Sequence, residues 1–299
     1  MASQQDIMLA QMVSGAGFIA ALDQSGGSTP GALKAYGIPE EAWSCDAEMF
    51  NAMHEMRVRV MTAPAFTGRR ILAAILFEAT MERELDSVPV PVALWRRGIV
   101  PFLKVDRGLE PEADGVQLMK PIPDLYMLLQ RAKELGVFGT KARSLIRSAS
   151  ATGIRAVVAQ QFDIAAQIAR RGLLPILEPE VSLQADDRLA AETMLHDALL
   201  DELNALQAGR RVMLKLTIPA EPDRYADLAG HPAVARVVAL SGGYSRPDAC
   251  AALALNRGLI ASFSRALLAD LRHGMEKTEF DHTLEAAIEE IYAASTFKS

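Results

Sequence analysis

The chain has 299 residues, of which 50% are hydrophobic and 23% are charged, and its formal net charge is −6. This length fits one α/β barrel of about 250 residues as well as two smaller domains. The acidic balance argues against a nucleic-acid-binding protein that relies on a basic face.

The compartment is indicated by the cysteines and by the N-terminus. Cys45 and Cys250 are the two cysteines, and they form neither a disulfide framework nor a thiolate zinc site, which is typical of a reducing cytoplasm. The N-terminal residues lack the pattern of a signal peptide, and no apolar run is long enough to span a membrane. We therefore expect a cytoplasmic protein without a membrane partner.

Short apolar runs and amphipathic segments alternate along the chain. After a first helix that ends near Met12, the predicted strands are 17–23, 71–77, 99–106, 137–143, 173–180, 212–217, 234–240 and 258–265. The predicted helices are 46–61, 123–135, 153–171, 186–207, 247–256 and 278–294. In the helix at 186–207 we expect Leu189, Leu195, Leu199, Leu203 and Leu206 to face the core.

Strands that read as continuous apolar runs are typical of a parallel sheet buried on both faces. Eight such units suggest a closed (β/α)₈ barrel. An open doubly wound sheet is the alternative, but it more often has a G-x-G-x-x-G turn after its first strand, and the sequence contains none. We therefore predict an α/β fold of the (β/α)₈ TIM-barrel class. Residues 1–299 would form a single domain with an extra helix at each end.

Lys215 lies inside the apolar run 212–217. Burial disfavours a charged ammonium group, so a lysine in such a strand often has a chemical role. The alternative is that its side chain extends past the strand end as a solubilising charge. Polar residues end other runs too, where the active site of a barrel lies, and this recurrence favours the chemical role. They are Asp23, Lys104, Lys141, Glu178, Ser241 and Arg265.

This set of side chains fits Schiff-base chemistry. A second lysine, Lys141, close to Lys215 would lower the pKa of the nucleophilic amine by like-charge repulsion, and Glu178 and Asp23 could transfer protons. Loops after the seventh and eighth strands are the usual phosphate site of such barrels, and here they contain Ser241-Gly242-Gly243 and residues 262–265. Lys104 with the hydroxyls of Ser25 and Ser28 would hold a second phosphate.

Several short motifs that contain these residues are similar to motifs of a known family. They are Ala21-Leu22-Asp23-Gln24-Ser25, the run 98–106, Leu177-Glu178-Pro179-Glu180, Leu214-Lys215, Leu240-Ser241-Gly242-Gly243 and the run 262–267. With these motifs in this order, the sequence resembles the class I, Schiff-base fructose-1,6-bisphosphate aldolases, especially their shorter bacterial branch, from about residue 15 to residue 268.

The resemblance implies a metal-independent lyase of glycolysis and gluconeogenesis without a cofactor. It would cleave fructose 1,6-bisphosphate to dihydroxyacetone phosphate and glyceraldehyde 3-phosphate. Lys215 would form the imine, Glu178 would be the main proton-transfer residue supported by Lys141 and Glu180, and Asp23 would polarise the hydroxyl lost in cleavage. The aldehyde-half phosphate would contact Ser25, Ser28, Lys104 and Arg143. The ketone-half phosphate would contact Ser241, Gly242, Gly243, Ser262, Ser264 and Arg265.

Three features depart from the animal enzymes of the family. Ser264 stands where they have glycine, Gly31 and Ala32 replace a basic pair, and no C-terminal tail with a terminal tyrosine is present. Tyr292, which falls in the last predicted helix, is interpreted as a packing residue. The five histidines show no metal-ligand spacing.

Two alternatives remain open from the sequence. Another Schiff-base barrel enzyme of phosphorylated sugars, such as a transaldolase-like or tagatose-bisphosphate enzyme, would have similar groups. A non-catalytic sugar-phosphate sensor would have lost them, whereas Lys215 and Glu178 are both present. We also expect a homo-oligomer, either a dimer or a tetramer.

Overall fold

The computed structural model describes residues 2–25, 27 and 29–299. In this part of the chain, eight parallel strands close into a barrel, because β11 pairs with β1 and β5 pairs with β7. The barrel strands are β1 (Phe18–Leu22), β2 (Ile71–Leu76), β5 (Val100–Lys104), β7 (Gly139–Ile146), β8 (Leu174–Val181), β9 (Val212–Thr217), β10 (Val234–Leu240) and β11 (Leu259–Phe263). The predicted (β/α)₈ barrel is confirmed.

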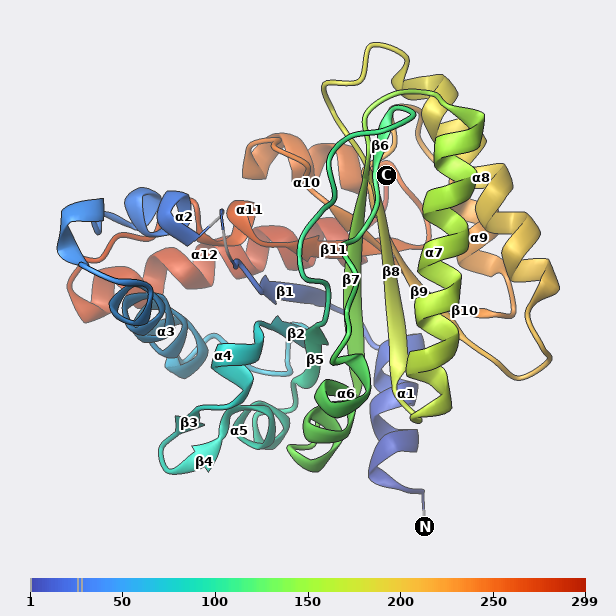
Figure 1. Ribbon diagram of the computed structural model, residues 1–299. Helices are drawn as coiled ribbons and strands as arrows, with labels where there is room; N and C mark the ends of the chain where they lie inside the picture. Colours follow the sequence, from blue (N-terminus) through green and yellow to red (C-terminus); the bar gives the residue numbers. More distant parts are fainter. Residues whose placement is uncertain (1, 26, 28) are drawn as a thin grey trace.

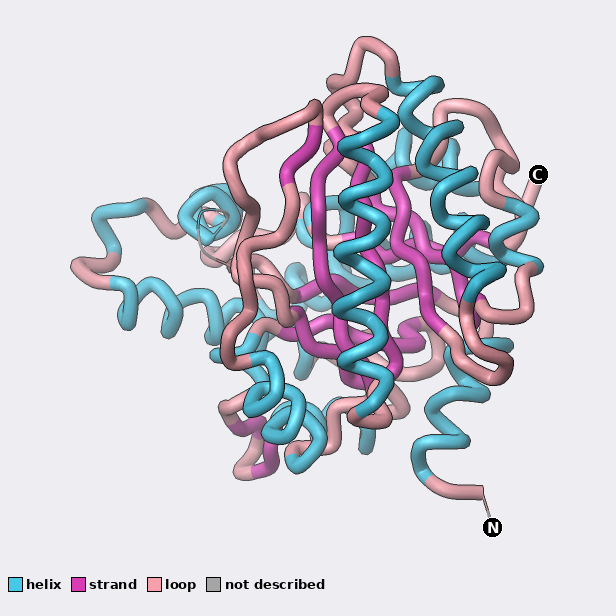
Figure 2. Tube along the Cα trace, turned by 45° about the vertical axis from the view of Figure 1, so that its right-hand side comes forward, coloured by secondary structure: helices cyan, strands magenta, loops and turns pink. Residues whose placement is uncertain are grey.

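Helices surround this barrel (Figures 1 and 2). They are α1 (Gln4–Ser14), α2 (Thr29–Tyr36), η2 (Glu40–Ala42), α3 (Asp46–Thr62), α4 (Glu78–Met81), α5 (Val90–Arg96), α6 (Leu125–Glu134), α7 (Ala151–Arg170), α8 (Arg188–Ala205), α9 (Ala226–Gly230), α10 (Arg246–Ala254), α11 (Arg265–Leu268) and α12 (Lys277–Thr296). Within the described residues, no helix has the length and apolar character needed to cross a bilayer.

The short elements were not predicted. They are the helices α4, α5, α9 and α11, the hairpin of β3 (Glu84–Leu85) and β4 (Val88–Pro89), and β6 (Val116–Gln117), which pairs antiparallel with β7. Elements of two to seven residues contain too few positions to show a hydrophobic period, so the sequence carries little signal for them.

The barrel has an apolar interior that is separate from the outer core under the helices. Successive side chains of a strand point to opposite faces, so in β9 Met213 faces inward whereas Leu214 and Leu216 face the outer helices. Ile176 of β8 and Phe102 of β5 join Met213 in the interior. Because the side chains alternate, the next residue that points inward on each strand is the one two positions later in the sequence.

Helix α1 closes the end of the barrel where the strands begin (Figure 1). Met8 and Met12 are fully buried and pack with the inward strand residues. The Gln11 side-chain amide donates to the carbonyls of Leu72 and Gly98, both at 2.8 Å. Since this end is filled, the open space within the barrel lies at the opposite end, where the strands finish.

Candidate active site

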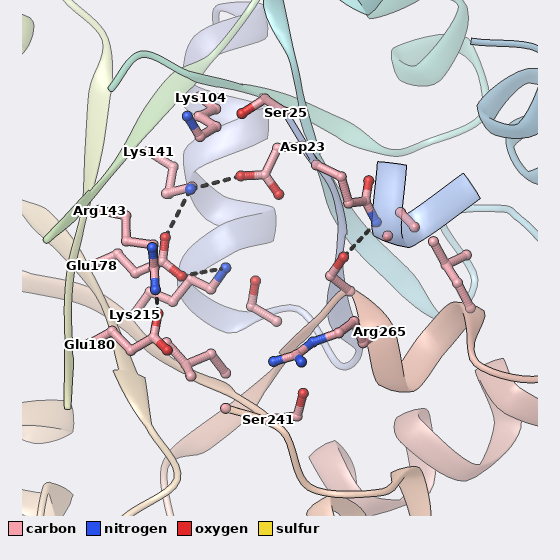
Figure 3. Close-up of a pocket in the computed structure, with 18 of the residues that line it drawn as sticks. Asp23, Ser25, Lys104, Lys141, Arg143, Glu178, Glu180, Lys215, Ser241 and Arg265 are labelled. Atoms are coloured by element: carbon pink, nitrogen blue, oxygen red, sulfur yellow. Dashed lines mark hydrogen bonds and ion pairs between the residues drawn. The ribbon is translucent and has the colours of Figure 1, made fainter. Parts of the chain in front are cut away.

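The predicted catalytic residues and Lys104 occupy the inward positions just above the apolar interior. Lys215 lies two residues after Met213, Glu178 two after Ile176, and Lys104 two after Phe102, so each extends the inward row of its own strand. They line a cavity of about 960 Å³ at the carboxyl end of the barrel (Figure 3). Residues far apart in the sequence thus meet because parallel strands finish at the same rim.

A buried ion-pair network forms the centre of the site. The Lys215 Nζ lies 2.8 Å from Oε1 of Glu178, and the Lys141 Nζ lies 2.9 Å from Oε2 of the same carboxylate. Lys141 also contacts Oδ2 of Asp23 at 2.7 Å. Lys141 is 2% exposed and Lys215 5%, so the predicted alternative of a lysine that reaches into solvent is wrong. The two lysines are joined by the carboxylate that lies between them.

The charges in this network support one another. Burial opposes the ionised form of Glu178 and Asp23, but the nearby ammonium groups of Lys141 and Lys215 outweigh it and hold the pKa of both carboxyls below the usual range. Burial likewise lowers the pKa of Lys141, and the carboxylates of Asp23, Glu178 and Asp106 reverse this effect and raise it above its usual value. Lys141 therefore stays protonated.

Asp106 was missed as a site residue by the sequence interpretation. Its Oδ1 lies 2.6 Å from the Nζ of Lys104, and its Oδ2 accepts from the backbone N–H of Arg143 at 3.2 Å and lies 3.7 Å from the Nζ of Lys141. The signal was present, because Asp106 ends the same run that contains Lys104. Asp106 therefore lies between Lys104 and Lys141 and contacts both ammonium groups.

Glu180 and Arg143 form a pair at the rim of the cavity. Arg143 Nε lies 2.5 Å from Oε2 of Glu180. Burial lowers the pKa of Arg143, but the Glu180 carboxylate raises it by more, so the guanidinium stays charged. Glu180, expected to assist proton transfer, is therefore held by Arg143 and lies one inward position above Glu178 on β8.

The two predicted phosphate sites lie at opposite ends of the cavity. In Figure 3, Lys104 and Ser25 mark one end and Ser241 and Arg265 the other, with Lys141, Glu178 and Lys215 between them. Gly242, Ser262 and Ser264 also line the cavity, as do Gly31 and Ala32. Ser28 falls outside the described residues. Both ends of the cavity are therefore lined by side chains that can donate hydrogen bonds.

The glycines after β10 are needed for their backbone conformation. Gly242 has φ +61°, and a Cβ there would lie 2.9 Å from Cγ of Leu183. Gly243 has φ +129° and is not among the residues that line the cavity; a Cβ at this position would lie 3.9 Å from a guanidinium nitrogen of Arg265. The loop thus brings its backbone close to both Leu183 and Arg265, and the predicted contact of Gly243 with a phosphate stays a prediction.

Comparison with known proteins identifies the family. Residues 9–219 match the family model of class I fructose-bisphosphate aldolase. A fructose-bisphosphate aldolase class 1 from Synechocystis sp. is 54% identical over 288 residues, which cover 96% of each chain. The chain belongs to the class I fructose-bisphosphate aldolases. The predicted activity, that of a lyase of glycolysis, is confirmed by this membership.

Solved structures of aldolases share the fold. An aldolase from Plasmodium falciparum, crystallised with TRAP and a small-molecule inhibitor, has a TM-score of 0.71 at 22% identity and covers 100% of this chain and 97% of its own. An archaeal fructose-1,6-bisphosphate aldolase, whose catalytic lysine is bound to the carbinolamine intermediate, has a TM-score of 0.54 at 11% identity, covering 95% and 99%. These similarities support the barrel assignment.

Two other predictions concern residues outside the network. Tyr292, interpreted as a packing residue, is partly buried and packs against the outer core, as expected. Among the residues that the structure describes, no group of three or more His, Cys, Asp or Glu side chains has the arrangement of a metal site.

Proposed function

We propose that Lys215 is the nucleophile of this aldolase and forms the imine with the ketone carbon of fructose 1,6-bisphosphate. The observation that carries this assignment is the position of Glu178, whose carboxylate lies 2.8 Å from the Lys215 Nζ in a buried pocket. A carboxylate at hydrogen-bond distance can take a proton from the ammonium group, which leaves a neutral amine able to attack.

Glu178 is the proton-transfer group of imine formation. After the amine has attacked, Glu178 returns its proton to the carbinolamine hydroxyl, which leaves as water, and the protonated imine forms. Lys141 lies 2.9 Å from the other oxygen of Glu178 and stays charged. Its role is therefore electrostatic: it keeps Glu178 in the ionised form that accepts the first proton.

Cleavage of the bond between C3 and C4 follows from the imine. The electron pair of this bond moves toward the protonated nitrogen, which stabilises the developing carbanion far better than a carbonyl can. Asp23 takes the proton of the C4 hydroxyl, so the leaving half departs as an aldehyde. The low pKa of Asp23, held down by Lys141 and Lys215, keeps it ionised and ready to accept.

The phosphates fix the sugar along the cavity. Arg265 and Ser241 at one end, with Gly242, Gly243, Ser262 and Ser264, bind the ketone-half phosphate. Lys104 at the other end binds the aldehyde-half phosphate with Ser25 and Ser28, and Arg143, which lies beside Glu180, contributes to the same site. Anchoring both ends places C3 and C4 beside Lys215, Glu178 and Asp23. The reacting groups are then already oriented, which lowers the entropic part of the activation barrier.

Borohydride trapping tests the assignment. Reduction in the presence of dihydroxyacetone phosphate, followed by peptide mass mapping, should label Lys215 in the wild type and label nothing in the Lys215→Met variant, whose cleavage rate should fall by at least about a thousandfold. A label on another lysine, or unchanged cleavage by the variant, would contradict the proposal. A chelator should leave the rate unchanged, since no metal takes part.

We propose fructose 1,6-bisphosphate as the preferred substrate, which a kcat/KM comparison with tagatose 1,6-bisphosphate tests. We further propose a cytoplasmic enzyme that assembles as a homo-dimer or tetramer. Exposed Cys45 and buried Cys250 are both free thiols, which supports the proposal of a reducing compartment.

A further inference from the structure

A buried arginine lies behind the active site and takes no direct part in the proposed chemistry. Arg57 of α3 is 2% exposed, and it donates to the Thr80 hydroxyl at 2.8 Å and to the backbone carbonyl of Gln24 at 2.5 Å. No carboxylate lies within ion-pair distance of its guanidinium among the described residues, and its Nε has no hydrogen-bond partner there. A buried cation in this setting costs stability, which suggests a functional reason for it.

The side chain of Gln24 connects this arginine to the active site. One guanidinium nitrogen of Arg57 lies 3.4 Å from the side-chain oxygen of Gln24, and the Gln24 amide nitrogen donates to the Ser264 hydroxyl at 2.6 Å. Arginine has only donors, so the amide oxygen of Gln24 must face Arg57 and its NH₂ group must face Ser264. Arg57 thereby sets which way the amide points.

This orientation determines what the Ser264 hydroxyl can do. A hydroxyl has one proton to donate, and because Ser264 Oγ accepts from Gln24, its own proton is directed elsewhere. Ser264 lines the cavity beside Arg265, at the end that we assign to the ketone-half phosphate. The proton is therefore available to an acceptor in the cavity, and phosphate oxygens are strong acceptors.

We propose that Gln24 is a positioning residue that turns the Ser264 hydroxyl into a donor to the ketone-half phosphate, and that Arg57 fixes the Gln24 amide for this purpose. The inference rests on the proposed function. It gives the Ser264 side chain a specific role, as a hydrogen-bond donor to the phosphate. It also explains why residue 24 is glutamine, because an amide can accept from Arg57 and donate to Ser264 at the same time.

The Gln24→Glu variant tests this orientation with little change of shape. A carboxylate still accepts from Arg57, which gives the buried cation a counter-ion, so the variant should fold. However, a carboxylate has no proton to donate, so the Ser264 hydroxyl must donate to it and is no longer a donor to phosphate. We expect the KM for fructose 1,6-bisphosphate to rise by about tenfold from the lost hydrogen bond, in addition to charge repulsion.

A double-variant cycle with Ser264→Ala separates the two effects. Charge repulsion acts in both backgrounds, whereas the hydroxyl effect needs Ser264. Gln24→Glu should therefore raise the KM by a factor about ten times larger in the wild-type background than in the Ser264→Ala background. The KM for glyceraldehyde 3-phosphate in the condensation direction should show no such coupling with Ser264, because its phosphate binds at the other end of the cavity. Thermal melts of the variants check that each is folded.

Equal factors in the two backgrounds would overturn the inference, as would the same coupling with Ser264 in the KM for glyceraldehyde 3-phosphate. Failure of the proposed function would be seen in a different measurement, the trapping of Lys215. If wild-type enzyme is not trapped at Lys215, that proposal fails whatever Gln24 does. If the wild type is trapped and the cycle shows no coupling, only the role of Gln24 fails.

Discussion

At the scale of single residues, the site contains buried charges that are stable only because opposite charges lie next to them. Glu178 and Asp23 are 3% and 8% exposed, and each lies within 3 Å of the Lys141 ammonium. Removing one partner of a buried ion pair leaves the other without compensation, which costs more than the pair itself contributes. We therefore expect Lys141 to contribute to folding as well as to the proposed chemistry.

The Lys141→Met variant tests this double role. We expect the free energy of unfolding to fall by about 3–5 kcal/mol, because two buried carboxylates lose their shared cation. Cleavage should also slow, since the pKa of Glu178 rises when Lys141 is gone. Denaturant unfolding measures the first effect and steady-state kinetics the second. Lys277→Met is the control, because that lysine side chain is 81% exposed and its pair with Asp281 should contribute little. Equal losses in the two variants would contradict the prediction.

At the scale of elements, the junction of β8 and β9 holds Glu178 and Lys215, the groups that we propose as catalytic. The register between these strands comprises two residue pairs, Ile176 with Met213 and Leu177 with Leu214, whereas β7 and β8 pair over eight. Beyond the paired region, the Thr217 hydroxyl donates to the Val181 carbonyl at 2.7 Å and accepts from the Val181 N–H at 3.0 Å. This single side chain closes the end of the junction above Glu178 and Lys215.

Replacing Thr217 by valine removes both hydrogen bonds at nearly constant volume. Since Thr217 is 1% exposed, the N–H and carbonyl of Val181 should be left unsatisfied, and we expect a loss of stability of about 1–3 kcal/mol. We also expect a lower kcat, because Glu178 and Lys215 would no longer be held at a fixed separation. Thermal unfolding and steady-state kinetics measure the two effects. A variant with wild-type values for both would show that the junction needs no hydroxyl. The Thr217→Ser variant keeps the hydroxyl, so it should retain most of the wild-type stability and kcat.

The exposed face of α8 shows where the helical pattern was misread. Leu189 was expected to face the core but is 49% exposed, whereas Leu195, Leu199 and Leu203 are buried as predicted. Leu189 lies six residues before Leu195, which is not a helical repeat, and the inward positions of that turn are Ala191 and Glu192. Glu192 is buried because Arg188 donates to it at 2.7 Å.

At the scale of the whole molecule, the network couples stability to pH. The folded-state pKa values of Asp23 and Glu178 lie below their ordinary values of 3.8 and 4.5. These groups thus contribute stability that is present above those values and is lost as the pH falls through the folded-state pKa. The pKa of Lys141 is raised above 10.5, so its contribution is present below that pH and is lost as the pH rises further.

We expect the free energy of unfolding to decrease when the pH drops below about 4.5, through protonation of the buried carboxylates. In the Asp23→Asn variant this acid dependence should be weaker, because one of the groups no longer titrates. Denaturant unfolding at a series of pH values measures both curves. Identical acid slopes for wild type and variant would show that surface carboxylates, and not the network, cause the loss.

Much of the fold and most of the site could be read from the sequence. Each barrel strand is a continuous apolar run, since it is buried on both faces, and a polar residue two places beyond an inward apolar one stands out clearly, as Lys215 does after Met213. This local signal identifies which groups project from the strand ends. The family motifs then suggested the roles that we propose for Lys215, Glu178 and Asp23.

Only the tertiary structure decided which partners these groups have. That Glu178 lies between Lys141 and Lys215 depends on the positions of three strand ends, and the hydrogen bond of Gln24 with Ser264 joins residues 240 positions apart. Local hydrophobic periodicity carries no information about such contacts, because the closure of the barrel creates them. The same reason applies to α1, whose weak pattern gave no sign that Met8 and Met12 fill one end of the barrel.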